Sequence, residues 1–261
     1  MSHWKIVLAA VAFNLLFEYS MRGINDLTVH PLLPLFLSMV YFPYFILLED
    51  LIRKYHLRDY HLVIVGFFFG TVFTIFVPAT QFAEPQLLGI NWPVFFYVNI
   101  FWWGMIQGVL TFYIATRFFP RDWNHRLLTR KQKITLLLIL VLVGLTYRIS
   151  IQLNLPQAPK ITIETYATIA AVASVAALIF KKTIPKQITN TGQRKENIID
   201  IIGALTVAIF TFCAVFLTQD PTHINIHSVN ATAVRIVTWW TIIAALIMII
   251  YRVYKRRPIP I

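Results

Sequence analysis

Residues 6–24 read IVLAAVAFNLLFEYSMRGI, an apolar stretch with only two charged side chains, Glu18 and Arg22. A helix needs roughly 20 mostly apolar residues to cross the hydrocarbon core of a bilayer. No small-x-small cleavage pattern follows, so the stretch predicts a first membrane-spanning helix and not a cleaved signal peptide.

Seven further stretches downstream have the same length and apolar character. They are Pro31–Ile52, Leu62–Phe82, Val94–Phe119, Ile134–Leu153, Ile161–Phe180, Ile198–Thr218 and Val234–Tyr251. Eight spans take up about 160 residues of the 261 in the chain, which leaves only short connections. The sequence therefore predicts an all-α, polytopic transmembrane helix bundle, with residues 1–261 forming a single integral membrane domain.

The composition agrees with a membrane protein. Apolar residues make up 58% of the chain and charged residues 13%, against about 45–50% and about 25% in soluble domains. The formal net charge of +12 would suggest an acidic partner in a soluble protein. Here we interpret it as a topology signal, with the lipid bilayer as the partner and no role in nucleic-acid binding.

The distribution of basic residues predicts the orientation. With the N-terminus inside, the cytoplasmic segments hold 19 of the 23 Lys and Arg residues, as the positive-inside rule requires. The other four, near the outer helix ends, are Arg22, Arg148, Lys160 and Arg235. We therefore expect eight spans in a cell membrane, with both termini in the cytoplasm.

Pairs of small residues predict close helix packing. Gly66 and Gly70 lie four residues apart in the third span, and Gly104 and Gly108 do so in the fourth. Small residues let helix backbones approach each other in lipid. The sixth span repeats the pattern with alanines, including Ala173 and Ala177.

Ionisable residues inside a span usually face a partner or a water-filled cavity. In the first span, Asn14, Glu18 and Arg22 follow one another at intervals of four residues, so they share one helix face. One interpretation is a structural ion pair, and the other is a functional site. In the functional interpretation, Glu18 carries a coupling proton, because burial disfavours a charged carboxylate, and Arg22 or Arg148 holds an anionic group.

A second charged pair is predicted between the fifth and sixth spans. Arg148 lies in the outer half of the fifth span, and Glu164 lies near the outer end of the sixth. Since consecutive helices with a short link tend to pack together, we expect the two side chains to meet. Asn99 and Gln107 add polar groups deeper in the fourth span. The candidate substrate-binding residues are thus Glu18, Arg22, Arg148, Glu164, Asn99 and Gln107.

An outer loop carries a weak candidate metal site. His223 and His227 lie four residues apart, so they can face the same side of a helix or strand. Asp220, Glu84 or His30 is a candidate third ligand, since a catalytic zinc usually takes three protein ligands. Solvated loop histidines are the alternative interpretation.

Acidic residues also occur at a cytoplasmic helix end, where Glu49 and Asp50 precede Arg53 and Lys54. Paired acids can do acid–base chemistry, but the flanking cations favour a solvated ion-pair cluster.

Three function classes remain open. A small transporter or permease-like protein, or a membrane subunit of a larger assembly, is the first hypothesis. A membrane-embedded enzyme acting on a lipid or isoprenoid at the outer leaflet is the second. A non-catalytic scaffold or sensor that binds a membrane-protein partner, or a second copy of itself, is the third. The chain has no P-loop and no G-x-S-x-G motif, and the cofactor is unknown.

Overall fold

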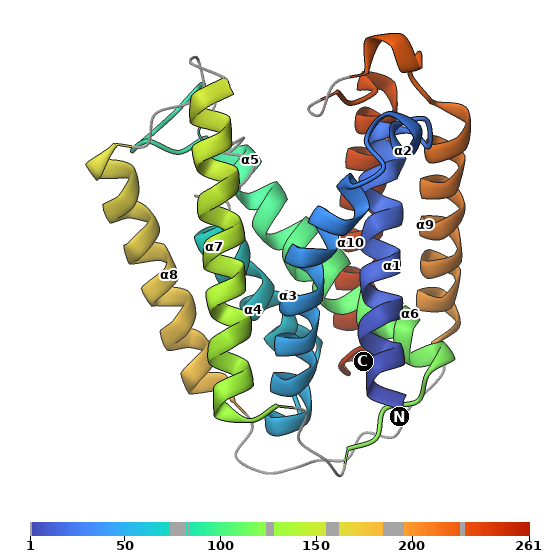
Figure 1. Cartoon of the computed structure of the whole chain (residues 1–261). Coiled ribbons are helices and arrows are strands. Elements are labelled where there is room, and N and C mark those ends of the chain that lie inside the picture. Colours follow the sequence, from blue (N-terminus) through green and yellow to red (C-terminus); the bar gives the residue numbers. More distant parts are fainter. Residues whose placement is uncertain are drawn as a thin grey trace.

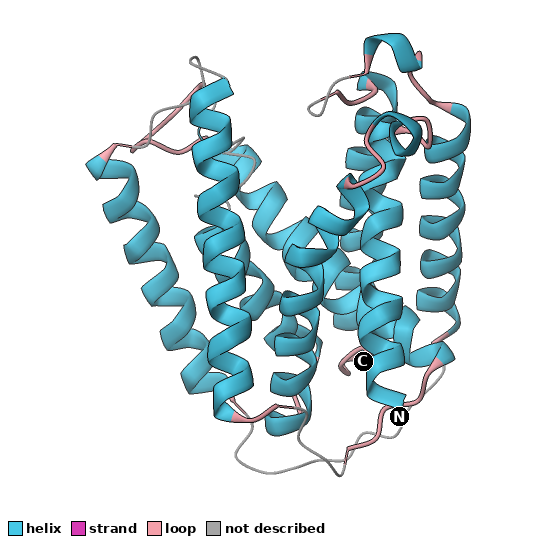
Figure 2. Ribbon diagram, viewed as in Figure 1, coloured by secondary structure: helices cyan, strands magenta, loops and turns pink. Residues whose placement is uncertain are grey.

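The computed structural model describes residues 2–73, 82, 84–123, 128–154, 162–184, 196–224 and 228–261. Within these ranges the chain is a bundle of helices joined by short loops, and no strand is present (Figure 2). The helices are α1 (Ser2–Arg22), α2 (Asp26–Val29), α3 (Leu33–Tyr55), α4 (Asp59–Phe73), α5 (Trp92–Phe96), the π-helix η2 (Tyr97–Leu110), α6 (Thr111–Phe118), α7 (Arg130–Asn154), α8 (Ile163–Thr183), α9 (Asn197–Phe216), the 3₁₀ turn η3 (Pro221–His223) and α10 (Ala231–Lys255).

Seven of these helical segments are long and apolar enough to cross a membrane. They are Trp4–Arg22, Leu33–Tyr55, Trp92–Phe118, Arg130–Ser150, Ile163–Thr183, Asn197–Phe216 and Ala231–Lys255. Each matches a predicted span to within a few residues. The predicted span Leu62–Phe82 coincides with the shorter apolar helix α4, and residues 74–81 lie outside the described part of the chain. The helical membrane bundle is therefore confirmed, while the count of eight spans stays a prediction.

Local sequence explains where several helices begin. Asn230, Thr162 and Asn91 each accept a hydrogen bond from a backbone N–H in the first turn of the helix that follows. Such caps satisfy N–H groups that lack a partner inside the helix. In a membrane protein they also allow a helix to start close to the lipid boundary, where unpaired N–H groups are costly.

The helices form two groups (Figure 1). Helices α1, α2, α9 and α10 lie together on the right of the view, and α4, α7 and α8 lie on the left. Helix α3 and the oblique segment α5–η2–α6 connect the groups across the middle. Both chain termini lie at one end of the bundle, which we call the charged end, and α2 lies at the opposite, distal end.

The tightest helix contact joins α4 to η2. A Cβ atom placed on Gly66 would lie 2.3 Å from the carbonyl oxygen of Trp103, and one on Gly108 would lie 3.2 Å from the carbonyl oxygen of Leu62. The two glycine pairs noted in the sequence therefore belong to one interface, in which backbones approach because side chains are absent. Helix α8 packs on α4 and buries Ala173, whereas Ala177 is exposed.

Substitution of Gly66 tests this contact. In Gly66→Ala the new methyl group meets backbone atoms that cannot rotate away, so we expect a lower melting temperature, by about 5 °C in detergent. Gly203→Ala is the matched control, because its Cβ would meet flexible side-chain atoms, of Ile114 at 3.1 Å and of Leu110 at 4.0 Å, and no backbone atom within 4 Å is among its three nearest contacts. Equal melting temperatures for the two variants would contradict the packing described here.

Candidate functional site

A ladder of charged side chains runs along α1 and α2. Arg22 Nε lies 3.8 Å from Glu18 Oε2, and Arg22 Nη1 lies 3.8 Å from Asp26 Oδ2. His30 Nδ1 lies 2.7 Å from Asp26 Oδ1. Glu18 and Arg22 share one face of α1, whereas Asp26 and His30 lie beyond the break at Gly23 (φ +83°), at the first residue and the C-cap of α2. The predicted pair of Glu18 and Arg22 is thus present, and Asp26 and His30 extend it to the distal end.

Other helices bring polar groups to Glu18. The hydroxyl of Tyr41, on α3, donates a short hydrogen bond to Glu18 Oε1. Gln107, on η2, lies beside the same hydroxyl. Tyr147, on α7, lies within electrostatic range of both Glu18 and Arg22. Four elements distant in sequence therefore converge on one carboxylate.

This polar site is largely removed from solvent. The side chains of Glu18 and Arg22 are 18% and 13% exposed, and that of Asp26 is 1% exposed. Gln107 and Asn14 are fully buried, and among the described residues no donor reaches the Asn14 Oδ1 atom. Buried polar groups without a partner cost about 1–3 kcal/mol each, so these positions are suited to a polar solute or to water.

Two further candidates are buried nearby or deeper in the bundle. Arg148 lies with Leu140 and Gly144 on the buried face of α7, and α7 packs against α3, the helix that carries Tyr41. Asn99 is fully buried in the α4–η2 interface, where a Cβ on Gly70 would lie 2.3 Å from its Oδ1. Glycine at position 70 therefore makes room for the Asn99 amide.

The expected meeting of Arg148 and Glu164 is not seen. Glu164 is exposed in the first turn of α8, and the structure forms no ion pair between these two described residues. The physical reason is that α8 packs mainly on α4 and α7 mainly on α3. A short connection therefore did not make these consecutive helices packing partners.

The candidate metal site is only partly described. His227 and the side chain of His223 lie outside what the structure describes. Asp220 Oδ1 accepts hydrogen bonds from the backbone N–H and the hydroxyl of Thr222, at 2.9 and 2.7 Å, so it stabilises the η3 turn. Among the described residues, no three His, Cys, Asp or Glu side chains are grouped so that they could hold a metal.

The charged end contains a buried ion cluster. Glu49 accepts hydrogen bonds from Arg53 Nε at 2.9 Å and from Arg121 at 2.8 Å, the latter through two nitrogens. The side chains of all three residues are at most 1% exposed. Arg121 also donates to the main-chain oxygen of Ile261 at 2.5 Å. The prediction of a solvated ion-pair cluster is therefore wrong. Glu49 is buried because the segment before α7 and the chain after α10 cover it.

Ion pairs at this end also join helices from the two groups. Asp59, at the start of α4, pairs with Arg252 of α10 at 2.7 Å and accepts from the Ile259 N–H at 3.0 Å. Burial raises the pKa of the Asp59 carboxyl, and the Ile259 N–H and Arg252 act in the opposite direction. Asp50 pairs with Lys133 at the start of α7.

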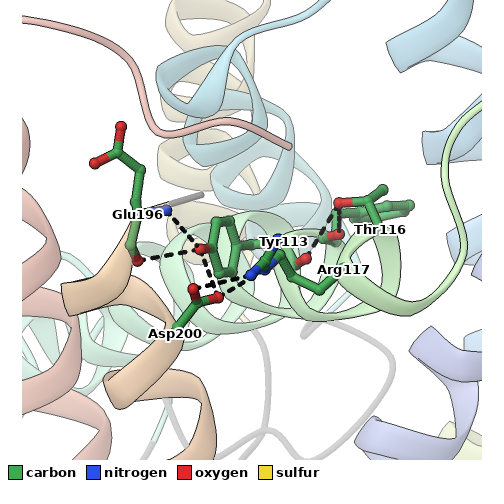
Figure 3. Close-up of polar contacts among 6 residues, drawn as sticks. Tyr113, Thr116, Arg117, Glu196 and Asp200 are labelled. Carbon is green, nitrogen blue, oxygen red and sulfur yellow. Dashed lines mark hydrogen bonds and ion pairs between the residues drawn. The ribbon is translucent and has the colours of Figure 1, made fainter. Parts of the chain in front are cut away.

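A further polar cluster fixes the start of α9 (Figure 3). Arg117, on α6, binds Asp200 through two nitrogens at 2.7 and 3.0 Å. The hydroxyl of Tyr113 donates to Asp200 Oδ1 at 2.8 Å and accepts from the Glu196 N–H at 3.3 Å. Glu196 in turn pairs with Arg257, at 3.2 Å. The charged end is thus held by contacts among α3, α4, α6, α7, α9 and α10.

Comparisons of this chain with family models, with curated proteins and with solved structures find no match. The protein class is therefore assigned from the sequence and structure of this chain alone. In the part of the chain that the structure describes, seven long apolar helices indicate a multipass helical membrane protein.

The buried cluster at the charged end predicts a large stability effect. In Glu49→Gln two buried guanidinium groups lose their shared counter-charge, which we expect to cost about 3–5 kcal/mol. Asp200→Asn removes a pair whose side chains are 30% and 32% exposed, so it should cost about 1 kcal/mol or less. Thermal unfolding of both purified variants measures the difference. Equal destabilisation would show that Glu49 is not the central ion of this end.

Proposed function

We propose that this chain is a small membrane transporter, or the membrane subunit of one, with Glu18 as the proton-coupling carboxylate. The observation that carries the proposal is the hydrogen bond from Tyr41 to Glu18, inside the membrane-spanning helices α1 and α3. Ionisable groups at such depth are rare and mark solute or proton pathways.

Protonation of Glu18 would change how two helices are joined. A charged Glu18 attracts Arg22 and accepts strongly from the Tyr41 hydroxyl, because a hydrogen bond to an ion is about twice as strong as a neutral one. A neutral Glu18 loses most of both interactions. The protonation state of one residue thereby alters the contact between α1 and α3, which is the coupling that a proton-driven carrier needs.

The distribution of polar contacts supports alternating access. At the charged end, α4 is joined to α10 by the Asp59–Arg252 pair, which links the two helix groups. Distal contacts hold the group of α1, α2, α9 and α10 together: the Ile24 N–H donates to Ala214 and the Asn230 N–H to Met21, both at 2.8 Å. In carriers that work by a rocking motion, two rigid helix groups stay joined at one end while they separate at the other.

The charges also suggest roles for the two arginines. Arg22 lies between two carboxylates, which reduces its attraction for an anionic solute. We therefore assign the anion-binding role to Arg148, on the face of α7 that packs against α3. We orient the charged end towards the cytoplasm, since it carries most of the basic residues.

Substitution of Glu18 tests the proposal. Purified protein is reconstituted into phosphatidylcholine–phosphatidylglycerol liposomes containing a pH-sensitive dye, and a panel of amino acids, organic acids and sugars is added. We expect at least one solute to drive proton movement in wild type. In Glu18→Gln this movement should fall about tenfold or more, because a glutamine cannot carry the proton.

Glu164→Gln is the matched control, since it removes an exposed carboxyl group near the distal end and should transport normally. Undiminished, pH-independent proton movement in Glu18→Gln would overturn the proposal. So would the lack of any solute-driven proton movement in wild type.

A further inference from the structure

A short, stiff segment follows α10 at the charged end (Figure 1). The helix ends at Arg256, whose left-handed conformation (φ +50°) redirects the chain. Beyond it, residues 257–261 read RPIPI, in which proline alternates with isoleucine. Proline fixes its own φ and restricts the residue before it to extended conformations. We call residues 257–261 the strap.

The strap has one apolar face. In an extended chain alternate side chains point to the same side, and Ile259 and Ile261 are 2% and 9% exposed. Both belong to the main hydrophobic core of the bundle, whereas Pro258 and Pro260 are only partly buried. Because its backbone is stiff and its apolar side chains lie on one side, the strap docks and undocks as one piece.

The start of the strap is anchored on the group that contains α9 and α10. Arg257 Nη2 lies 3.2 Å from an oxygen of Glu196, the residue that directly precedes α9. The hydroxyl of Tyr251, on α10, donates to the same carboxylate. Since Glu196 joins the strap to both helices, the strap moves with that group.

Two contacts hold the strap outside that group. The Ile259 N–H donates to Asp59 Oδ2 of α4 at 3.0 Å, and Arg252 of α10 pairs with the same oxygen at 2.7 Å. Arg121, from the segment between α6 and α7, donates to the main-chain oxygen of Ile261 at 2.5 Å. The Asp59 side chain is 2% exposed, so one buried carboxylate holds both α10 and the strap against α4.

We propose that the strap is the gate of the charged end and must leave Asp59 before α4 and α10 can separate. While the strap is docked, the charged end is closed. Once undocked, it moves with α9 and α10, and the charged end opens. Undocking exposes two isoleucines to water, which is unfavourable, so the docked state predominates. The role as a gate rests on the proposed transport function, whereas the separation of the helix groups can be measured without transport.

Distances between spin labels, measured by pulsed electron–electron double resonance on the full chain in lipid nanodiscs, report on both ends. The labels are attached to cysteines in a Cys213→Ser background. Lys182→Cys and Lys255→Cys form the charged-end pair, and Glu164→Cys and Thr222→Cys form the distal pair. All four labelled positions are exposed, and each pair places one label on α8 and one on the opposite helix group.

Substitution of Ile259 weakens the docked strap. In Ile259→Asn, burying an amide side chain is costly, so a population with a longer charged-end distance and a shorter distal distance should be about fivefold more abundant than in wild type. Val253→Asn is the matched control, because it makes the same change at a position of α10 that is 67% exposed. Its two distances should equal those of wild type.

Substitution of Asp59 loosens the strap from the other side and decides the question if Ile259→Asn does not fold. Asp59→Asn keeps the shape of the side chain but loses its charge, so both distances should shift in the same directions as in Ile259→Asn. Unchanged distances in either folded variant would overturn the proposal, as would the same shifts in Val253→Asn.

The distal pair separates a gate from a structural staple. If the charged-end distance lengthens in the strap variants while the distal distance stays as in wild type, the strap only holds the helix ends together and the proposal is wrong. Failure of the transporter hypothesis would appear separately, as undiminished proton movement in Glu18→Gln.

Discussion

The pairing of one buried carboxylate, Glu49, with two arginines is the interaction on which the arrangement of the bundle depends. Arg53 comes from the same helix, but Arg121 comes from the segment between α6 and α7. A buried guanidinium without a counter-ion is too costly to tolerate, so Glu49 fixes where that segment can lie. The contacts of Arg121 with Ile261 and of Asp59 with Ile259 then bring the chain beyond α10 to the same place.

In the distal half of the bundle, the described ion pairs lie within one segment of the chain and do not join distant helices. They run from Glu18 to His30, all within one stretch of α1 and α2. They therefore stabilise that segment without tying it to α7 or α8. The hydrogen bond from Tyr41 of α3 to Glu18 of α1 crosses between two membrane helices there, and its strength depends on whether Glu18 is charged. One end is thus fixed by permanent charges, and the other carries a contact that a proton can weaken.

The parts of this account that could be predicted from sequence are the local ones. Apolar length predicts a span whatever surrounds it, and the interval of four residues places Glu18 beside Arg22 without knowledge of the other helices. The burial of Glu49 could not be predicted in this way, since its covering residue Arg121 is far along the chain. Tyr41 was missed for a related reason: a tyrosine in a span is usually a packing residue, and only the tertiary arrangement shows that it binds Glu18.

The expected contact between Arg148 and Glu164 shows a different limit. The prediction assumed that consecutive helices pack together, but α8 packs mainly on α4 and α7 mainly on α3. Ala173 is buried in α8, which packs on α4, and Gly66 allows α4 to reach η2. Pair patterns such as these indicate that a helix will pack closely, without indicating against which neighbour.

The central claim is our proposal that solutes and protons reach the Glu18 site from the distal end while the charged end is closed. Its most direct test is the labelling of Tyr147→Cys by a membrane-impermeant maleimide, in a Cys213→Ser background that lacks the buried native thiol. Thr222→Cys and Lys255→Cys, both at exposed positions, mark the distal and charged ends. Our account predicts that Tyr147→Cys reacts only from the side on which Thr222→Cys reacts. Reaction from the Lys255→Cys side, or from neither side, would contradict it.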